Sequence, residues 1–193
     1  MAGNTTFDGE GRGSRWRTAV WGAAALLLLL PLVAMQVTDG MDWDLADFVI
    51  FGALLAGAGG AYELAARRTG SRAYRAAAGL ALATAFILVW MNLAVGIIGS
   101  EDNPANRMYG GVLAVGLVGA LMARFRPQGM ALASAATAAA QALVAVIALA
   151  AGWGSAPILT GIFMALWLAS AWLFRRAARE EMPAGAMTST NFR

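Results

Sequence analysis

Six mostly apolar stretches of about twenty residues follow one another along the chain, and the short segments between them carry most of its charge. A bilayer core about 30 Å thick needs about 20 apolar residues in a helix to cross it. Backbone groups inside hydrocarbon must pair within their own segment, so each stretch is expected to be helical. The sequence therefore predicts an all-α, polytopic transmembrane bundle of about six helices. The expected spans are residues 18–37, 48–66, 76–99, 104–123, 130–151 and 157–174.

Composition supports a membrane protein over a soluble one. Hydrophobic residues make up 60% of the 193 residues and charged residues only 13%, against about 45–50% and about 25% in a soluble domain. A soluble protein of this length cannot hide so much apolar surface, whereas a bilayer can. We expect a single transmembrane domain over residues 18–174. A mobile cytoplasmic segment, residues 1–17, precedes it, and a basic and then flexible cytoplasmic tail, residues 175–193, follows it.

The basic residues indicate the orientation in the membrane. All 14 are arginines, and in a six-helix topology only Arg107 falls on the side opposite the other 13. The positive-inside rule makes the arginine-rich side cytoplasmic, which places both termini in the cytoplasm. We expect the protein to lie in a bacterial inner membrane. The arginines lie at helix ends and not along one stripe, so the net charge of +3 is not read as a nucleic-acid-binding surface.

The chain contains no cysteine and no histidine. Disulfides, thiolate nucleophiles, iron–sulfur clusters and the usual zinc and haem ligands are therefore excluded. The commonest general base is missing too. No recognised catalytic motif is present, so we expect neither an enzyme nor a bound cofactor or metal.

The segment between the third and fourth spans is the most distinctive polar sequence. Asn103 is expected to cap the fourth helix, with Pro104 at its first position, and Glu101 and Asp102 are close enough in sequence to pair with Arg107. This predicts a short ordered hairpin between antiparallel neighbouring helices. In the alternative interpretation, the same four polar residues form an outward-facing mouth that contacts a cation, a solute or a basic partner.

An aspartate-rich loop and Glu63 are the other acidic features, and both are explained by contacts with nearby residues. The loop of residues 38–47 holds four aspartates, which suit a hard cation in principle. Its spacing does not match an EF-hand loop, and the bidentate terminal Glu of that loop is absent, so we expect Asp44 or Asp47 to cap the second helix instead. Glu63 precedes Arg67 by four residues, the favourable order for an ion pair on a helix.

The candidate polar interior consists of amides and hydroxyls. Asn92 lies in the third span, close to Trp90, and Gln141 lies in the fifth span, four residues after Thr137. A polar side chain facing lipid is unfavourable, so these residues are expected to point inward. They either hydrogen-bond neighbouring helices or line a polar cleft.

Three classes of function remain. An accessory or scaffold subunit that packs against membrane partners is favoured, with a small transporter or channel that has an acidic outward mouth as the alternative and a lipid-modifying enzyme last. Many small residues in the fourth and fifth spans, such as Gly116 and Gly119, predict close helix packing and argue against a wide pore. The expected partners are the lipid bilayer and either another membrane protein or further copies of this chain.

Overall fold

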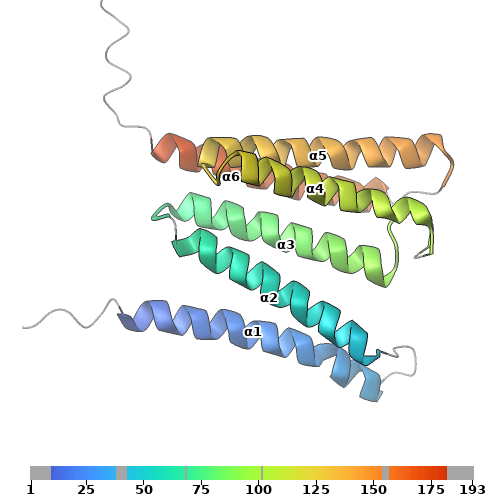
Figure 1. Cartoon of the computed structure of the whole chain (residues 1–193), viewed down its shortest axis with the longest axis horizontal. Helices are drawn as coiled ribbons and strands as arrows, with labels where there is room; N and C mark the ends of the chain where they lie inside the picture. Colours follow the sequence, from blue (N-terminus) through green and yellow to red (C-terminus); the bar gives the residue numbers. More distant parts are fainter. Residues whose placement is uncertain (1–9, 38–42, 68, 101, 154–156, 182–193) are drawn as a thin grey trace, which may run out of the picture. The chain divides into compact units, whose positions relative to one another are not determined.

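The structure, a computed structural model, describes residues 10–37, 43–67, 69–100, 102–153 and 157–181. This part of the chain is helical, with no strand in it, which confirms the predicted fold class. The helices are α1 (Glu10–Val37), α2 (Leu45–Arg67), α3 (Arg72–Ala94), the 3-10 helix η1 (Pro104–Arg107), α4 (Met108–Met122), α5 (Pro127–Ala150) and α6 (Pro157–Glu180) (Figure 1).

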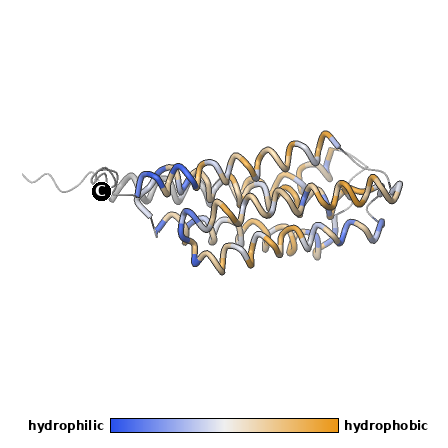
Figure 2. Tube along the Cα trace, turned by 90° about the horizontal axis from the view of Figure 1, so that it is seen from above, coloured by the Kyte–Doolittle hydropathy of each residue, from blue (hydrophilic) through white to orange (hydrophobic). Residues whose placement is uncertain are grey.

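Within the described residues, five helical segments are long and apolar enough to cross a bilayer. They are α2, α3, η1 with α4, α5 and α6, and a shorter apolar stretch, Ala24–Val37, lies within α1. Figure 2 shows that the hydrophobic residues fill the middle of the helices and that hydrophilic residues gather near helix ends. This distribution is the one a bilayer requires, because charged groups avoid its hydrocarbon core.

The chain divides into two compact units, residues 1–61 and 62–193. In the first unit, α2 begins with a reciprocal cap, in which the Asp44 N–H donates to Asp47 and the Asp47 N–H donates back to the Asp44 carboxylate. This arrangement satisfies backbone donors that a helix start leaves free. Trp21 of α1 packs on α2 at Gly59, where an added Cβ would lie 3.5 Å from the indole ring.

The second unit contains α3 to α6. The main packing partners are α5 with α6, α3 with α6, and α4 with α5, and successive helices run antiparallel (Figure 1). Its interior has two apolar clusters at different positions along the helix axes. One contains Tyr74 and Phe174 together with small alanines of α3, α5 and α6. The other contains Leu88, Tyr109 and Phe163. Between them α3, α5 and α6 contribute polar side chains.

Contacts between helix ends and connections define two opposite ends of this unit. At one end, Tyr74 bonds to Phe125 and Ser71 bonds to Glu180, which joins the start of α3 to the α4–α5 turn and to the end of α6. At the other end, Gly99 lies against the Trp153 carbonyl, which joins the α3–α4 and α5–α6 connections. Arg107 belongs to the second end. The first end carries Arg72, Arg75, Arg124, Arg126, Arg175, Arg176 and Arg179.

The α3 helix stops at Ala94, short of residue 99, where the hydropathy pattern placed the end of the span. Gly96 and Gly99 both have φ of +67°, a left-handed conformation that ends a helix and suits glycine. Ile97 and Ile98 between them continue the apolar pattern but belong to a turn that folds back into the core. Apolar sequence alone does not distinguish such a buried turn from one more helical turn.

Candidate functional site

Asn106 organises the α3–α4 connection. Its side-chain Oδ1 accepts hydrogen bonds from the backbone N–H groups of Ile97 (3.0 Å) and Ile98 (2.9 Å). Its Nδ2 donates to the carbonyls of Ile98 (3.3 Å) and Ser100 (2.7 Å). Asn106 is itself buried, as are both isoleucines. A non-helical backbone at the edge of a membrane domain needs such internal partners, and one side chain supplies four of them.

The predicted hairpin exists, and its capping is as expected. Asn103 accepts from the Ala105 N–H at 3.0 Å, and Pro104 begins the 3-10 helix η1 that leads into α4. Asp102 and Arg107 are both exposed, but no ion pair joins them among the described residues. Glu101 lies outside the described residues. The hairpin is therefore held by Asn103 and Asn106, and the expected pairing of Asp102 with Arg107 does not form.

The structure describes some of the other acidic residues for which the sequence predicted a role. Asp39 and Asp42 of the aspartate-rich loop lie outside the described residues, while Asp44 and Asp47 cap α2 as predicted. The expected ion pair of Glu63 with Arg67 is confirmed, with 2.7 Å between the carboxylate and guanidinium atoms. These carboxylates are thus engaged locally in holding helix ends and faces.

A polar layer crosses the middle of the second unit. Ser170 of α6 donates to the Ala77 carbonyl of α3 at 3.0 Å and lies 3.5 Å from the Ser134 hydroxyl of α5. Thr84 and Thr137 donate to carbonyls one turn earlier in their own helices. All these side chains are buried. Ser170 therefore connects three helices, which is the interhelical role that polar residues often have in membrane bundles.

Gln141 is the exception in this layer. Its side chain is fully buried, yet neither Oε1 nor Nε2 has a hydrogen-bond partner in the described part of the chain. The indole Nε1 of Trp167 on α6 is also buried and has no hydrogen-bond partner among the residues that the structure describes. A buried amide without partners costs free energy that folding must offset elsewhere, on the order of 1–3 kcal/mol. This pair is therefore the most unusual polar feature of the interior.

Helix register places these two groups at similar depth. Ser134 and Ser170 are neighbours, and α5 and α6 run in opposite directions, so Gln141 lies level with Phe163 and about one turn beyond Trp167. Side chains on a helix lean toward its N-terminus, which carries the Trp167 ring toward the level of Gln141. One amide and one indole N–H thus share a layer between the two apolar clusters.

Asn92 and Trp90 lie elsewhere. Asn92 follows Leu88 by one turn, near the end of α3, and is partly exposed, although its Oδ1 is buried and meets no hydrogen-bond donor of the described ranges. Trp90 is also partly exposed. The contacts of Ser170 with Ala77 and Ser134 place Gln141 level with Thr84, about two helical turns before Asn92, and no hydrogen bond joins the two amides within the described residues. Thr137 does share the α5 face with Gln141, as the sequence pattern predicted.

The α4 and α5 helices approach each other very closely. A Cβ added to Gly119 would lie 2.8 Å from the Cβ of Ala133, and one added to Gly116 would lie 3.0 Å from the Thr137 hydroxyl. The residues at these contacts are therefore small enough to bring the two backbones together. No larger side chain fits at Gly119 without moving a helix. This confirms the predicted close packing of the glycine-bearing helix.

Sequence reasoning missed three residues that organise the second unit. No role was assigned to Asn106, Ser170 or Tyr74 from the sequence. Ser170 and Tyr74 bond to backbone groups far away in sequence, and Asn106 bonds back to the turn that precedes its own helix. The available signal was weak, because a lone amide or hydroxyl within an apolar region indicates that a partner exists but not which one.

No protein-family model matches the chain, and neither the curated proteins nor the solved structures contain a significant match.

Proposed function

We propose that this protein is a multi-pass accessory subunit of a bacterial inner membrane, with both termini in the cytoplasm and no catalytic step of its own. Its role would be to pack against a helix of another membrane protein. The gathering of seven arginines at one end of the second unit supports this orientation, because arginine-rich ends stay on the cytoplasmic side.

The close approach of α4 and α5 is the observation that carries the proposal. Glycine and alanine at this contact leave no space for a water-filled path between the two helices. The hydroxyls of the central layer bond to one another or to helix backbone. Such an interior supports a packing role better than conduction, which needs a continuous polar route.

Gly110 and Gly111 indicate where a partner helix would bind. Both are exposed near the start of α4, and a Cβ added to either would meet nothing within 4 Å. Glycine destabilises a helix relative to alanine, so its use is favoured where another backbone approaches closely. Gly116 and Gly119 of the same helix meet α5 in this way. We assign Gly110 and Gly111 to a transmembrane helix of a different protein.

The test is native mass spectrometry after extraction into lipid nanodiscs. A defined partner should co-purify with the wild type, and Gly110→Leu with Gly111→Leu should remove it. Gly161→Leu, which also fills open space at an exposed helical glycine, should retain the partner. A monomer without any partner, a complex of identical copies, or equal retention in all variants would contradict the proposal.

Gln141 favours a second candidate, a small transporter of neutral hydrogen-bonding solutes. Its unpartnered amide and the Trp167 indole N–H would both be satisfied by such a solute passing through the polar layer. Liposome uptake assays with wild type and Gln141→Leu would decide this. Solute-specific uptake that disappears in Gln141→Leu would establish transport, whereas no uptake above empty liposomes would exclude it for the solutes tested.

A further inference from the structure

Two pairs of arginines meet at one end of the second unit. Arg72 and Arg75 lie in the first turn of α3, and Arg124 and Arg126 lie in the turn between α4 and α5. Tyr74, between the first two, donates its hydroxyl to the Phe125 carbonyl, between the second two, over 2.7 Å. This single bond fixes segments far apart in sequence next to each other and gathers their positive charges. We call these four residues the arginine cluster.

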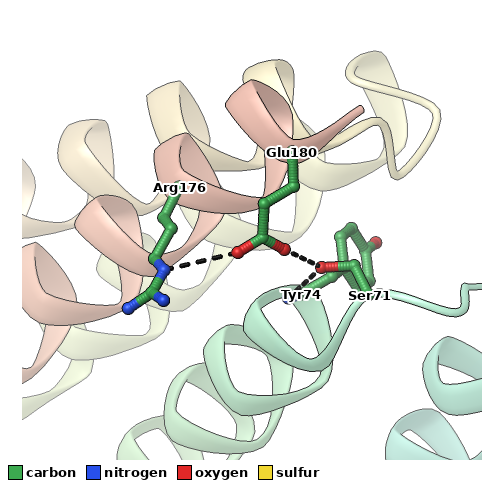
Figure 3. A network of polar contacts seen from close by, with 4 residues as sticks. All are labelled: Ser71, Tyr74, Arg176 and Glu180. Atoms are coloured by element: carbon green, nitrogen blue, oxygen red, sulfur yellow. Dashed lines mark hydrogen bonds and ion pairs between the residues drawn. The ribbon is translucent and has the colours of Figure 1, made fainter. Parts of the chain in front are cut away.

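The arginine cluster has no acidic partner within the described residues. Its four side chains are exposed, and the ion pairs at helix surfaces join other arginines, Arg67 with Glu63 and Arg176 with Glu180. Glu180 is the carboxylate fixed closest to α3, and Figure 3 shows it held between Arg176 and Ser71. The cluster therefore presents uncompensated positive charge.

The turn that carries half of this charge has a strained backbone. Arg124 and Phe125 have φ of 50° and 60°, a region that costs residues other than glycine about 1–2 kcal/mol. The N–H of Arg124 bonds to Leu121 and that of Phe125 to Ala120, the pattern of a helix end that normally has glycine at this point. At the equivalent end of α5, Gly152 occupies the position. Arginine thus stands where the backbone alone favours glycine.

Apolar residues border the arginine cluster directly. Leu121 and Met122, in the last turn of α4, are exposed, with Met122 80% accessible. Phe125 is exposed as well. A surface that changes from long apolar side chains to arginines within one helical turn matches the boundary between acyl chains and phosphates. A free phosphate ion would need the arginines but not the apolar border.

We propose that the arginine cluster binds the headgroup phosphate of an anionic phospholipid, whose acyl chains lie along Leu121 and Met122. Arginine side chains suit phosphate because their planar forks donate two parallel hydrogen bonds. The membrane places anionic lipid at this height, where basic residues next to spans are attracted to it. The proposal depends on membrane insertion and not on the partner assigned to Gly110 and Gly111.

The experiment measures lipid retained by the purified protein. The full chain is reconstituted in nanodiscs of phosphatidylcholine with a minority of phosphatidylglycerol, extracted again, and its bound lipids are quantified by mass spectrometry. The wild type should be enriched in phosphatidylglycerol. Arg124→Gln with Arg126→Gln should lower that enrichment by about fivefold for each arginine removed. Arg107→Gln, at the opposite end, should leave it unchanged.

A second variant keeps the test decisive if loss of charge disturbs insertion. Tyr74→Phe retains every arginine and removes the hydroxyl that donates to Phe125, so enrichment should fall at least about twofold as the two pairs separate. Equal enrichment in Tyr74→Phe, or in the double arginine variant, would overturn the proposal. Displacement of the lipid by inorganic phosphate, but not by chloride at equal ionic strength, would also overturn it in favour of a soluble anion.

Discussion

Asn106 and Ile98 are bonded to each other in both directions, since the Asn106 side chain accepts from the Ile98 N–H at 2.9 Å and donates to the Ile98 carbonyl at 3.3 Å. This pairing lets the chain leave α3 early and bury Ile97 and Ile98 in the apolar cluster around Tyr109 and Phe163. The turn is therefore a part of the core that happens to lack helical hydrogen bonds.

Replacing Asn106 should destabilise the second unit strongly. Asn106→Ala removes four hydrogen bonds and leaves two buried N–H groups without partners, at a cost of about 3 kcal/mol or more. Asn106→Asp should cost less, because its carboxylate still accepts from Ile97 and Ile98 but cannot donate to the carbonyls. Chemical unfolding in mild detergent measures both. A loss below about 1 kcal/mol for the alanine variant would show that the turn does not depend on this side chain.

Replacing Gln141, in contrast, should raise the free energy of unfolding. Gln141→Leu substitutes an apolar side chain of similar size for a buried amide without partners, so the free energy of unfolding should rise by about 1 kcal/mol. Thr137→Val is the matched control, since the Thr137 hydroxyl does have a partner in Ala133, and it should be neutral or slightly destabilising. A clear loss of stability in Gln141→Leu would mean that the amide is satisfied by a bound water or solute.

The left-handed residues at the ends of α4 and α5 give a paired prediction. Arg124→Gly should increase the free energy of unfolding by about 0.5–1 kcal/mol, because glycine tolerates the positive φ that arginine does not. Gly152→Ala, at the equivalent end of α5, should decrease it by about 1 kcal/mol. Thermal unfolding in detergent compares the two. If Arg124→Gly proves destabilising, the arginine side chain must have a structural role that outweighs the backbone strain.

Close packing of α4 against α5 predicts different results for glycines of the same helix. Gly119→Ala places a Cβ 2.8 Å from that of Ala133, so the helices must separate and stability should fall by about 1–3 kcal/mol. Gly110→Ala meets open space and should be neutral or slightly stabilising when the chain is isolated. Equal effects at the two positions, measured by unfolding in detergent, would contradict the close approach.

Much of the architecture was predictable because it follows from hydropathy and charge. The helical fold, the Asp44 and Asp47 cap, the Glu63–Arg67 pair and the Asn103 cap depend on residues within a few positions of each other. Such local patterns can be recognised without knowing the tertiary structure. The close packing of α4 against α5 was also predictable, because small residues are frequent in both helices.

The remaining features depend on contacts that sequence does not encode locally. The end of α3 was misplaced because Ile97 and Ile98 are as apolar as a helical turn, although the side chain of Asn106 holds them in a different conformation. Pairing of Asp102 with Arg107 was expected from sequence proximity, but exposed ion pairs contribute only about 0–1 kcal/mol and do not determine side-chain positions. The Tyr74–Phe125 bond could not be found without the packing of α3 beside the α4–α5 turn.

The central claim, a membrane-spanning chain whose arginine-rich end faces the cytoplasm, is tested most directly by reporter fusions at the ends of the helices. A cytoplasm-active reporter should be active after Ser71, Gln128 and Glu181, and a periplasm-active reporter should be active after Trp43, Asn103 and Trp153. This pattern is the one that six spans with both termini inside would produce. Activity of any one fusion on the opposite side would contradict the proposed topology.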